Sequence, residues 1–262
     1  MTSTTMTRSI RTNHQQSPAA TVAGIPFGRL FRGEWGKATD TRAARWLLAL
    51  VAASTVALLL VPLLAPASTD QSYTGYLRFA AMGLTILLPV VSILTLTSEW
   101  SQRTVLTTFT QEPRRIRVVT AKVTVSLLLA GGAAVFGGLV TVAGLAVAAI
   151  SGRQLDANLD AGIVVGYLLY VVLNVLAGAA LGALVHNSAA AIALFFALPA
   201  GFALLGQAWR PIAEWIDSTT TFDWLLKGQW SGHTVQILVT VVLWVAVPLS
   251  VGLARTVRRE IN

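Results

Sequence analysis

The chain has 262 residues and a net charge of +8; 55% of its residues are hydrophobic and only 11% are charged. Soluble globular proteins carry charged residues at about a quarter of their positions, so this composition, with a mean hydropathy of +0.68, excludes an ordinary soluble domain. The sequence contains no cysteine, which excludes disulfides, thiol nucleophiles and cysteine metal sites.

The first 45 residues precede any long apolar segment. Residues 1–24 are rich in Ser, Thr and Gln, and we expect them to form a disordered cytoplasmic tail. Residues 25–45 predict an amphipathic helix lying in the membrane interface, because apolar residues recur there at helical spacing. Its apolar stripe holds Phe27, Leu30, Phe31, Glu34/Trp35 and Ala38, while Arg29, Arg32 and Lys37 lie off that stripe. Several glycines in this range favour the alternative, a basic linker with little structure.

Six long apolar ranges follow, and each is long enough to cross a bilayer, which takes about 20 residues of helix. They cover about 46–64, 77–98, 119–150, 161–184, 189–208 and 234–254. The fourth and fifth ranges form one apolar run whose polar break is His186-Asn187-Ser188. The sequence therefore predicts an all-α integral membrane protein with six transmembrane helices in residues 46–254.

The cations set the expected orientation, because Lys and Arg near span ends prefer the cytoplasmic side. With both termini cytoplasmic, fifteen of the nineteen cations fall inside, including those of a short tail at 255–262, and four fall outside. We therefore predict a multi-pass protein of the bacterial plasma membrane. The cations flank membrane segments without forming a domain-sized basic face, so lipid headgroups fit them better than nucleic acid does.

The segment between the second and third spans, 98–118, is long and charged. Glu99 and Arg103 are four residues apart in the favourable order for a helical ion pair, and we expect a short helix over 98–110. Pro113 stops that helix, and a second helix is expected to start there. Three cations then lie in its first turn, Arg114, Arg115 and Arg117, where the helix dipole disfavours them. Their partner is expected outside the helix, either lipid phosphates or an acidic protein surface.

Small residues are spaced for close helix packing in two spans. One set is the GxxxG pair Gly178 and Gly182. The second is the stripe of Ala130, Ala134 and Gly138. We expect both sets to pack helices within one bundle rather than between subunits. Asn174, one turn before the GxxxG, is expected to hydrogen-bond across helices.

The segment 209–233, before the last span, holds four of the eight tryptophans. Apolar residues share a face in each half of it, so two short interfacial or re-entrant helices are expected on the outer side, with Trp as headgroup-level anchors.

The chain offers no energy source of its own. It has no G-x-x-x-x-G-K-[ST] phosphate loop, and the middle of each predicted span lacks the acids, bases and histidines that serve as ion relays. The three histidines are far apart and do not form a His-Glu-x-x-His metal motif. We therefore do not expect an enzyme, a bound metal or a cofactor in this chain.

The segment 98–122 resembles the first cytoplasmic loop of ATP-binding-cassette permeases of the type-2 exporter class. The residues that carry the resemblance are Glu99, Arg103, Thr104, Pro113, Arg115 and Lys122. The chain departs from the family at Gln102-Arg103, where many relatives have glycine before threonine. The resemblance implies a loop that rests in a groove of a separate ATPase subunit, with Arg114 among its coupling residues. It also implies a second permease copy, as a homodimer or related heterodimer, and ATP and Mg bound by the partner.

The resulting hypothesis is a permease subunit that exports a hydrophobic or amphipathic substrate with ATP hydrolysed by the separate subunit. The alternative from another class is a non-transporting membrane scaffold or sensor with the same topology. A secondary carrier, driven by an ion gradient, is a third reading and would need the ion relay that the spans lack.

Overall fold

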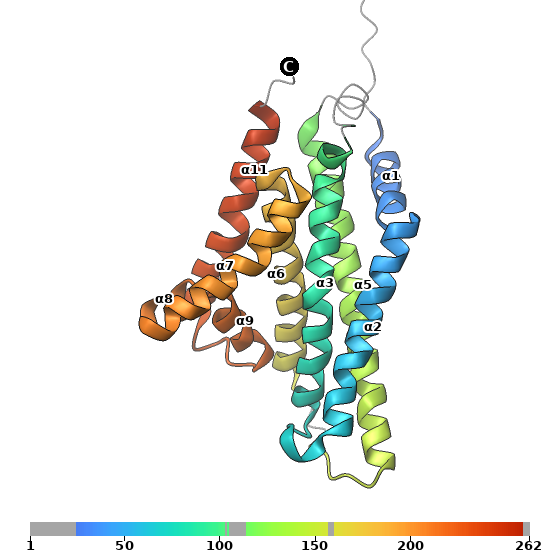
Figure 1. Ribbon diagram of the computed structural model, residues 1–262, viewed down its shortest axis with the longest axis vertical. Coiled ribbons are helices and arrows are strands. Elements are labelled where there is room, and N and C mark those ends of the chain that lie inside the picture. Colours follow the sequence, from blue (N-terminus) through green and yellow to red (C-terminus); the bar gives the residue numbers. More distant parts are fainter. Residues whose placement is uncertain (1–24, 103, 105–113, 157–159, 259–262) are drawn as a thin grey trace, which may run out of the picture.

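Figure 1 shows a computed structural model of the chain, which describes residues 25–102, 104, 114–156 and 160–258. The regular elements in these residues are all helices. In chain order they are α1 (Phe27–Thr39), α2 (Arg42–Leu64), a short 3₁₀ turn (Pro66–Ser68), α3 (Tyr73–Ser101), α5 (Arg115–Ile150), α6 (Ala161–Val185), α7 (Ser188–Ala208), α8 (Arg210–Trp215), α9 (Ser218–Leu226), α10 (Thr234–Val241), the π-helical turn η2 (Val242–Ala246) and α11 (Val247–Arg258).

Six helices in the described residues are long and apolar enough to cross a membrane: α2, α3, α5, α6, α7 and the continuous helix formed by α10, η2 and α11. The chain is therefore an all-α integral membrane protein, and each predicted span lies within one of these helices. Both α3 and α5 begin four residues earlier than their predicted spans, at Tyr73 and Arg115. Polar and charged end residues can extend a spanning helix beyond the hydrocarbon, so apolar length alone underestimates it.

Polar side chains start five of the helices, as the N-cap preference predicts. Each caps a backbone N–H two or three residues ahead; the capping residues are Thr41, Ser72, Asp160, Asn187 and Asp217. The Thr41 cap breaks the predicted helix over 25–45. The amphipathic part ends at Thr39, and residues 42–45 form the first turn of α2 instead.

The predicted break between the fourth and fifth spans lies where the sequence places it. Helix α6 ends at Val185 and α7 starts at Ser188. His186 has φ 56°, in the left-handed region that ends many helices, and its N–H donates to the carbonyl of Gly182. The chain reverses there in two residues.

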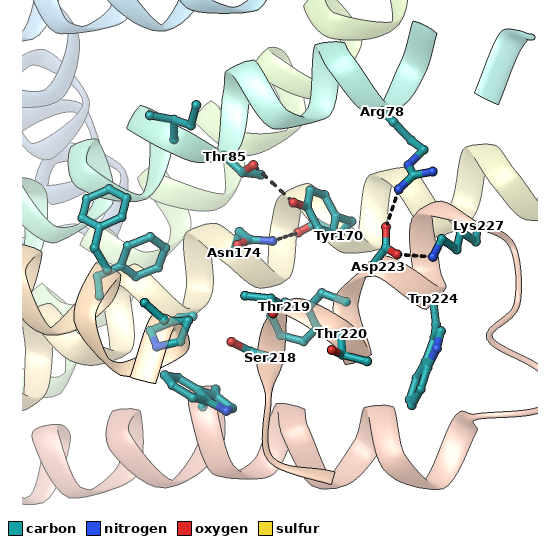
Figure 2. Close-up of a pocket in the computed structure, with 18 residues that line it drawn as sticks. Arg78, Thr85, Tyr170, Asn174, Ser218, Thr219, Thr220, Asp223, Trp224 and Lys227 are labelled. Carbon is teal, nitrogen blue, oxygen red and sulfur yellow. Dashed lines mark hydrogen bonds and ion pairs between the residues drawn. The ribbon is translucent and has the colours of Figure 1, made fainter. Parts of the chain in front are cut away.

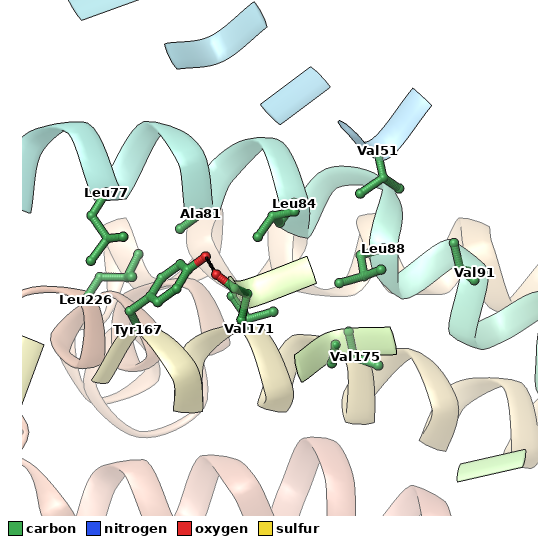
Figure 3. Packing of buried hydrophobic residues seen from close by; sticks show 12 residues of the cluster. Val51, Leu77, Ala81, Leu84, Leu88, Val91, Tyr167, Val171, Val175 and Leu226 are labelled. Carbon is green, nitrogen blue, oxygen red and sulfur yellow. Dashed lines mark hydrogen bonds between the residues drawn. The ribbon is translucent and has the colours of Figure 1, made fainter. Parts of the chain in front are cut away.

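Helices α3 and α6 form the centre of the bundle and are the most buried of the six, while α7 is the least buried. Figure 3 shows the core between them, where Leu84, Leu88 and Val171 pack together. The hydroxyl of Tyr167 reaches across this core and donates to the carbonyl of Ala134 on α5 at 2.8 Å. A buried phenol therefore ties α6 to α5.

The GxxxG pair packs α6 against α3 within the bundle. A Cβ at Gly178 would lie 2.7 Å from the carbonyl oxygen of Pro89, and one at Gly182 would lie 3.1 Å from Leu96. Both glycines therefore permit close approach of the two helices.

The second small-residue face differs from the prediction at its last position. Ala130 and Ala134 are buried, but a Cβ at Gly138 would meet nothing within 4 Å. Gly137 continues the face instead, against the Tyr167 hydroxyl. Because an α-helix has 3.6 residues per turn, strict four-residue spacing drifts off a face, and a step of three restores it.

One end of the bundle brings together helices from the start, the middle and the end of the chain. Helix α1, the start of α5 and the end of α11 lie at the same end, at the top in Figure 1, which we call the α1 end. Two short helices, α8 and α9, occupy the 209–233 segment as predicted. The predicted tail at 255–262 begins inside α11, which runs to Arg258, and residues 1–24 lie outside the described part of the chain.

Candidate functional site

Four charged side chains meet at the α1 end, from three helices that are distant in sequence. Helix α1 supplies Glu34 and Lys37, which are three residues apart and so share a face. The last turn of α3 supplies Glu99, and the second turn of α5 supplies Lys122. We call these four residues the charge cluster.

Each cation of the charge cluster contacts both carboxylates. The Nζ of Lys122 lies 2.7 Å from Oε2 of Glu34 and 3.4 Å from Oε1 of Glu99. The Nζ of Lys37 lies 2.6 Å from Oε1 of Glu34 and 3.3 Å from Oε1 of Glu99. Lys122 also donates to the carbonyl oxygen of Thr95 at 3.1 Å. The four charges sum to zero and alternate in sign around the cluster.

Three members of the cluster are almost fully buried. The side chains of Lys122, Glu34 and Glu99 are 2%, 3% and 7% exposed, whereas that of Lys37 is 50% exposed. Buried charges are tolerated when they are paired and hydrogen-bonded, and removing one partner strands the other. The cluster therefore holds α1, α3 and α5 in one relative arrangement.

Burial and pairing act in opposite directions on the two charges of α1. Burial alone would raise the pKa of Glu34, but attraction and hydrogen bonds from Lys122 and Lys37 outweigh it and lower that pKa below its ordinary value. Burial alone would lower the pKa of Lys37, and its bonds and attraction to Glu34 and Glu99 outweigh that and raise it. Both side chains are therefore charged near neutral pH.

A cavity of about 390 Å³ adjoins the charge cluster at the α1 end. Glu34, Lys37 and Glu99 line it together with apolar side chains of α2 and α3 such as Leu47 and Val91. Further polar side chains line it from the start of α2, from the last two turns of α3 and the segment after it, and from the start of α7: Thr41, Thr95, Ser98, Ser101, Gln102, Thr104 and Ser188. The cluster therefore borders the place where the chain leaves α3.

Of the residues predicted for coupling, three lie in or next to the charge cluster and two lie outside the described residues. Glu99 and Lys122 lie in the charge cluster. Thr104 donates its backbone N–H to the carbonyl of Glu99 at 3.0 Å, close to the cluster. Arg103 and Pro113 lie outside the described residues, so the predicted ion pair between Glu99 and Arg103 stays a prediction. Of the helix predicted over 98–110, the structure describes the part up to Ser101, which is the end of α3.

The arginines at the start of α5 reach other parts of the chain. Arg114 is the N-cap residue of α5, which starts at Arg115. Arg115 donates to the carbonyl of Thr256 at 2.8 Å, and Arg117 donates to the carbonyl of Ile25 at 2.7 Å. The expected external partners, lipid phosphates or an acidic protein surface, stay a prediction. Within the described chain, backbone carbonyls accept hydrogen bonds from Arg115 and Arg117, and the Thr256 carbonyl belongs to the last turn of α11, the negative end of that helix.

Sequence reasoning missed the contribution of α1 to this site. Glu34 lies on the apolar stripe of an amphipathic helix, where a carboxylate is unexpected, and that position was the available signal. Lys37 lies off the stripe as predicted, yet its ammonium turns back to Glu34 one turn away.

A second cavity, of about 730 Å³, lies between α3, α6, α7, α9 and η2 (Figure 2). Its polar side holds Arg78, Asp223 and Lys227, with Asp223 between the two cations. Asn174 also lines this cavity. It was predicted to hydrogen-bond across helices, but its amide donates to the carbonyl of Tyr170 on the same helix at 2.9 Å.

No group of three or more His, Asp or Glu side chains suited to a metal ion occurs in the described residues. Comparisons of the chain with protein-family models, with curated proteins and with solved structures found no match.

Proposed function

We propose that this chain is the membrane-spanning subunit of an ATP-binding-cassette exporter in a bacterial plasma membrane. In this proposal the α1 end faces the cytoplasm, and a separate ATPase subunit contacts the segment between α3 and α5. A second permease copy completes the transporter, which carries a hydrophobic or amphipathic substrate.

The charge cluster is the observation that carries the proposal. It joins the last turn of α3 to the second turn of α5, so both ends of the proposed coupling segment are fixed to one buried network. The same network includes α1 through Glu34. Because breaking a buried ion pair is expensive, a push on this segment moves α1, α3 and α5 together rather than bending the loop alone.

The placement of charge supports an external energy source. Among the described residues, the buried acidic and basic side chains on the long helices are Glu99 and Lys122, both near the α1 end and both in ion pairs. A proton- or ion-driven carrier uses such groups near the middle of the membrane, as a relay along the path. In this proposal the energy for transport therefore comes from a partner that hydrolyses ATP.

The experiment is to coexpress the chain with a cassette ATPase from the same organism and to reconstitute the purified complex in vesicles. Glu99→Gln keeps the size of the side chain but removes its charge from the cluster. We expect it to keep the ATPase bound while ATP-driven transport falls at least tenfold. Glu214→Gln is the matched control, because Glu214 lies on α8 with 47% of its side chain exposed.

The outcomes separate the candidate functions. Transport by Glu99→Gln at the rate of the unaltered protein would show that the coupling assignment is wrong. Flux that an uncoupler abolishes and that an inactive ATPase leaves unchanged would identify a secondary carrier. No ATP-dependent flux of any tested amphiphile, with no ATPase retained, would favour the scaffold or sensor.

A further inference from the structure

The second cavity has a charged side and an apolar side at different depths of the bundle. Arg78 lies within two turns of the start of α3, and Asp223 and Lys227 lie on or next to α9. The apolar lining comes from the middle of the long helices and from η2: Ile86, Phe195, Phe196, Pro199 and Trp244. A ligand that fills the cavity therefore meets charge at one end and only weakly polar surface at the other.

The charged side carries an excess of positive charge. The Nη2 of Arg78 lies 3.2 Å from Oδ1 of Asp223, and the Nζ of Lys227 lies 2.5 Å from Oδ2. One carboxylate thus serves two cations, whose side chains are 47% and 40% exposed. In the described part of the chain Arg78 donates to Asp223 through one of its five N–H groups, so it has donors left for a second anion.

The nearby Asp217 does not cancel this excess. Its carboxylate is buried at the start of α9, where it accepts hydrogen bonds from the Thr219 amide and hydroxyl and from the Thr220 hydroxyl. A carboxylate at a helix N-terminus is also offset by the helix dipole. The anion-seeking groups of the cavity are therefore Arg78 and Lys227.

The apolar side is built around an irregular turn. Helix α10 passes into the π-helical turn η2, which precedes Pro248, a residue without an N–H to continue the α-helical pattern. Trp244 in this turn donates its indole N–H to the carbonyl of Ile216 at 2.7 Å and packs edge-on against Phe202. Single π-helical turns occur often at functional sites, and this one presents an aromatic ring to the cavity.

We propose that this cavity binds an amphiphile with an anionic head group. The anionic head group contacts Arg78 and Lys227 while both cations keep their ion pairs with Asp223. The apolar chain runs along Phe195 and Phe196 to Trp244. The volume of about 730 Å³ is within the range of about 300–1,000 Å³ that holds ligands of this size. Calling the amphiphile the transported substrate rests on the proposed function, whereas its binding does not.

Tryptophan quenching tests the binding, because bromine quenches indole fluorescence on contact and Trp224 and Trp244 both line the cavity. The purified chain in detergent is titrated with 9,10-dibromostearate, a brominated anionic amphiphile. We expect saturable quenching, most of which is absent in Trp244→Phe. Trp224→Phe gives a second, independent readout if the first substitution impairs folding. Brominated dodecyl maltoside, which is uncharged, is the matched probe.

Substitutions of the cations test the head-group contact. Arg78→Gln and Lys227→Gln should each raise the dissociation constant of dibromostearate about five- to tenfold, because each removes a charge-assisted bond at a partly exposed site. Arg210→Gln is the control, since its side chain is 92% exposed and lies outside the cavity lining. It should leave the constant unchanged.

A lipid source is distinguished from a free amphiphile by repeating the titration with brominated phosphatidylglycerol and phosphatidylcholine. Trp244-dependent quenching by dibromostearate supports the proposal with a free amphiphile as the ligand. Trp244-dependent quenching by brominated phosphatidylglycerol alone supports it with an anionic lipid as the ligand. Equal quenching by the uncharged probes, or quenching that Trp244→Phe does not reduce, overturns it. The binding assay contains no ATPase and so does not depend on the proposed function. If the chain binds the amphiphile but the reconstituted complex shows no ATP-driven transport, only the proposed function is contradicted.

Discussion

Lys122→Met removes the most buried cation of the charge cluster while keeping much of its side-chain volume. In the native protein this ammonium lies 2.7 Å and 3.4 Å from two carboxylates and 3.1 Å from a backbone carbonyl. The substitution leaves Glu34 and Glu99 facing each other with only the half-exposed Lys37 between them. Removing one partner of a buried ion pair costs about 3–5 kcal/mol, and we expect a loss of unfolding free energy in that range.

Unfolding of the purified protein in mixed micelles, titrated with a denaturing detergent, measures this loss. Adding Glu34→Gln to Lys122→Met removes the stranded carboxylate, so the double variant should regain at least about 1 kcal/mol. Arg45→Met is the control, because Arg45 pairs with Asp40 at 4.0 Å with both side chains largely exposed. Such a pair contributes at most about 1 kcal/mol.

Two results would refute this reasoning. One is a cost for Lys122→Met as small as that of the Arg45→Met control. The other is a double variant less stable than Lys122→Met alone. Either would mean that the buried charges do not hold the three helices together.

Three further predictions concern pH, packing and orientation. The pKa of Glu34 is depressed in the folded state, so its contribution to stability is present above its ordinary pKa of 4.5 and is lost as the pH falls below that value. Glu34→Gln should therefore reduce the loss of unfolding free energy between about pH 6 and 3, measured in the same unfolding assay. Gly178→Val should cost about 1–3 kcal/mol or more in the same unfolding assay, because a Cβ there meets a backbone oxygen at 2.7 Å, while Gly201→Val, with nothing within 4 Å, should cost less than about 0.5 kcal/mol. Since the chain has no cysteine, Gly232→Cys should react with an impermeant maleimide on intact cells and Gly33→Cys only after permeabilisation; the reverse pattern would invert the proposed orientation.

The elements of the fold were predictable because each depends on local sequence. Apolar length located the six long helices, and the polar His186-Asn187 pair located the turn between α6 and α7. The amphipathic pattern located α1, although the Thr41 cap ends it earlier than expected. Each of these signals lies within one continuous segment of the chain, so a single sequence contains them.

The charge cluster was only half predictable because it depends on contacts between distant segments. Glu99 was expected to pair with Arg103, four residues ahead, and this pair stays a prediction because Arg103 lies outside the described residues. Its cations in the described structure are Lys37, 62 residues away, and Lys122 on another helix. Helical periodicity states which face a residue occupies, but it does not state which other helix meets that face. The same limit applies to Asn174, whose cavity appears only once α7 and α9 are in place.

Helix α3 connects the charge cluster to the second cavity. Glu99 in its last turn belongs to the cluster, and Arg78 near its start belongs to the cavity, about 31 Å apart along the helix axis at 1.5 Å per residue. Pro89 lies between them and interrupts the hydrogen bonds of α3, which would make it the natural place for a bend. Gly178 brings α6 against the Pro89 carbonyl there, and the close packing supports α3 at its weakest point. In the proposed cycle, movement at Glu99 therefore reaches the cavity as a shift of the α3–α6 pair against the less buried α7, rather than as a bend of α3 alone.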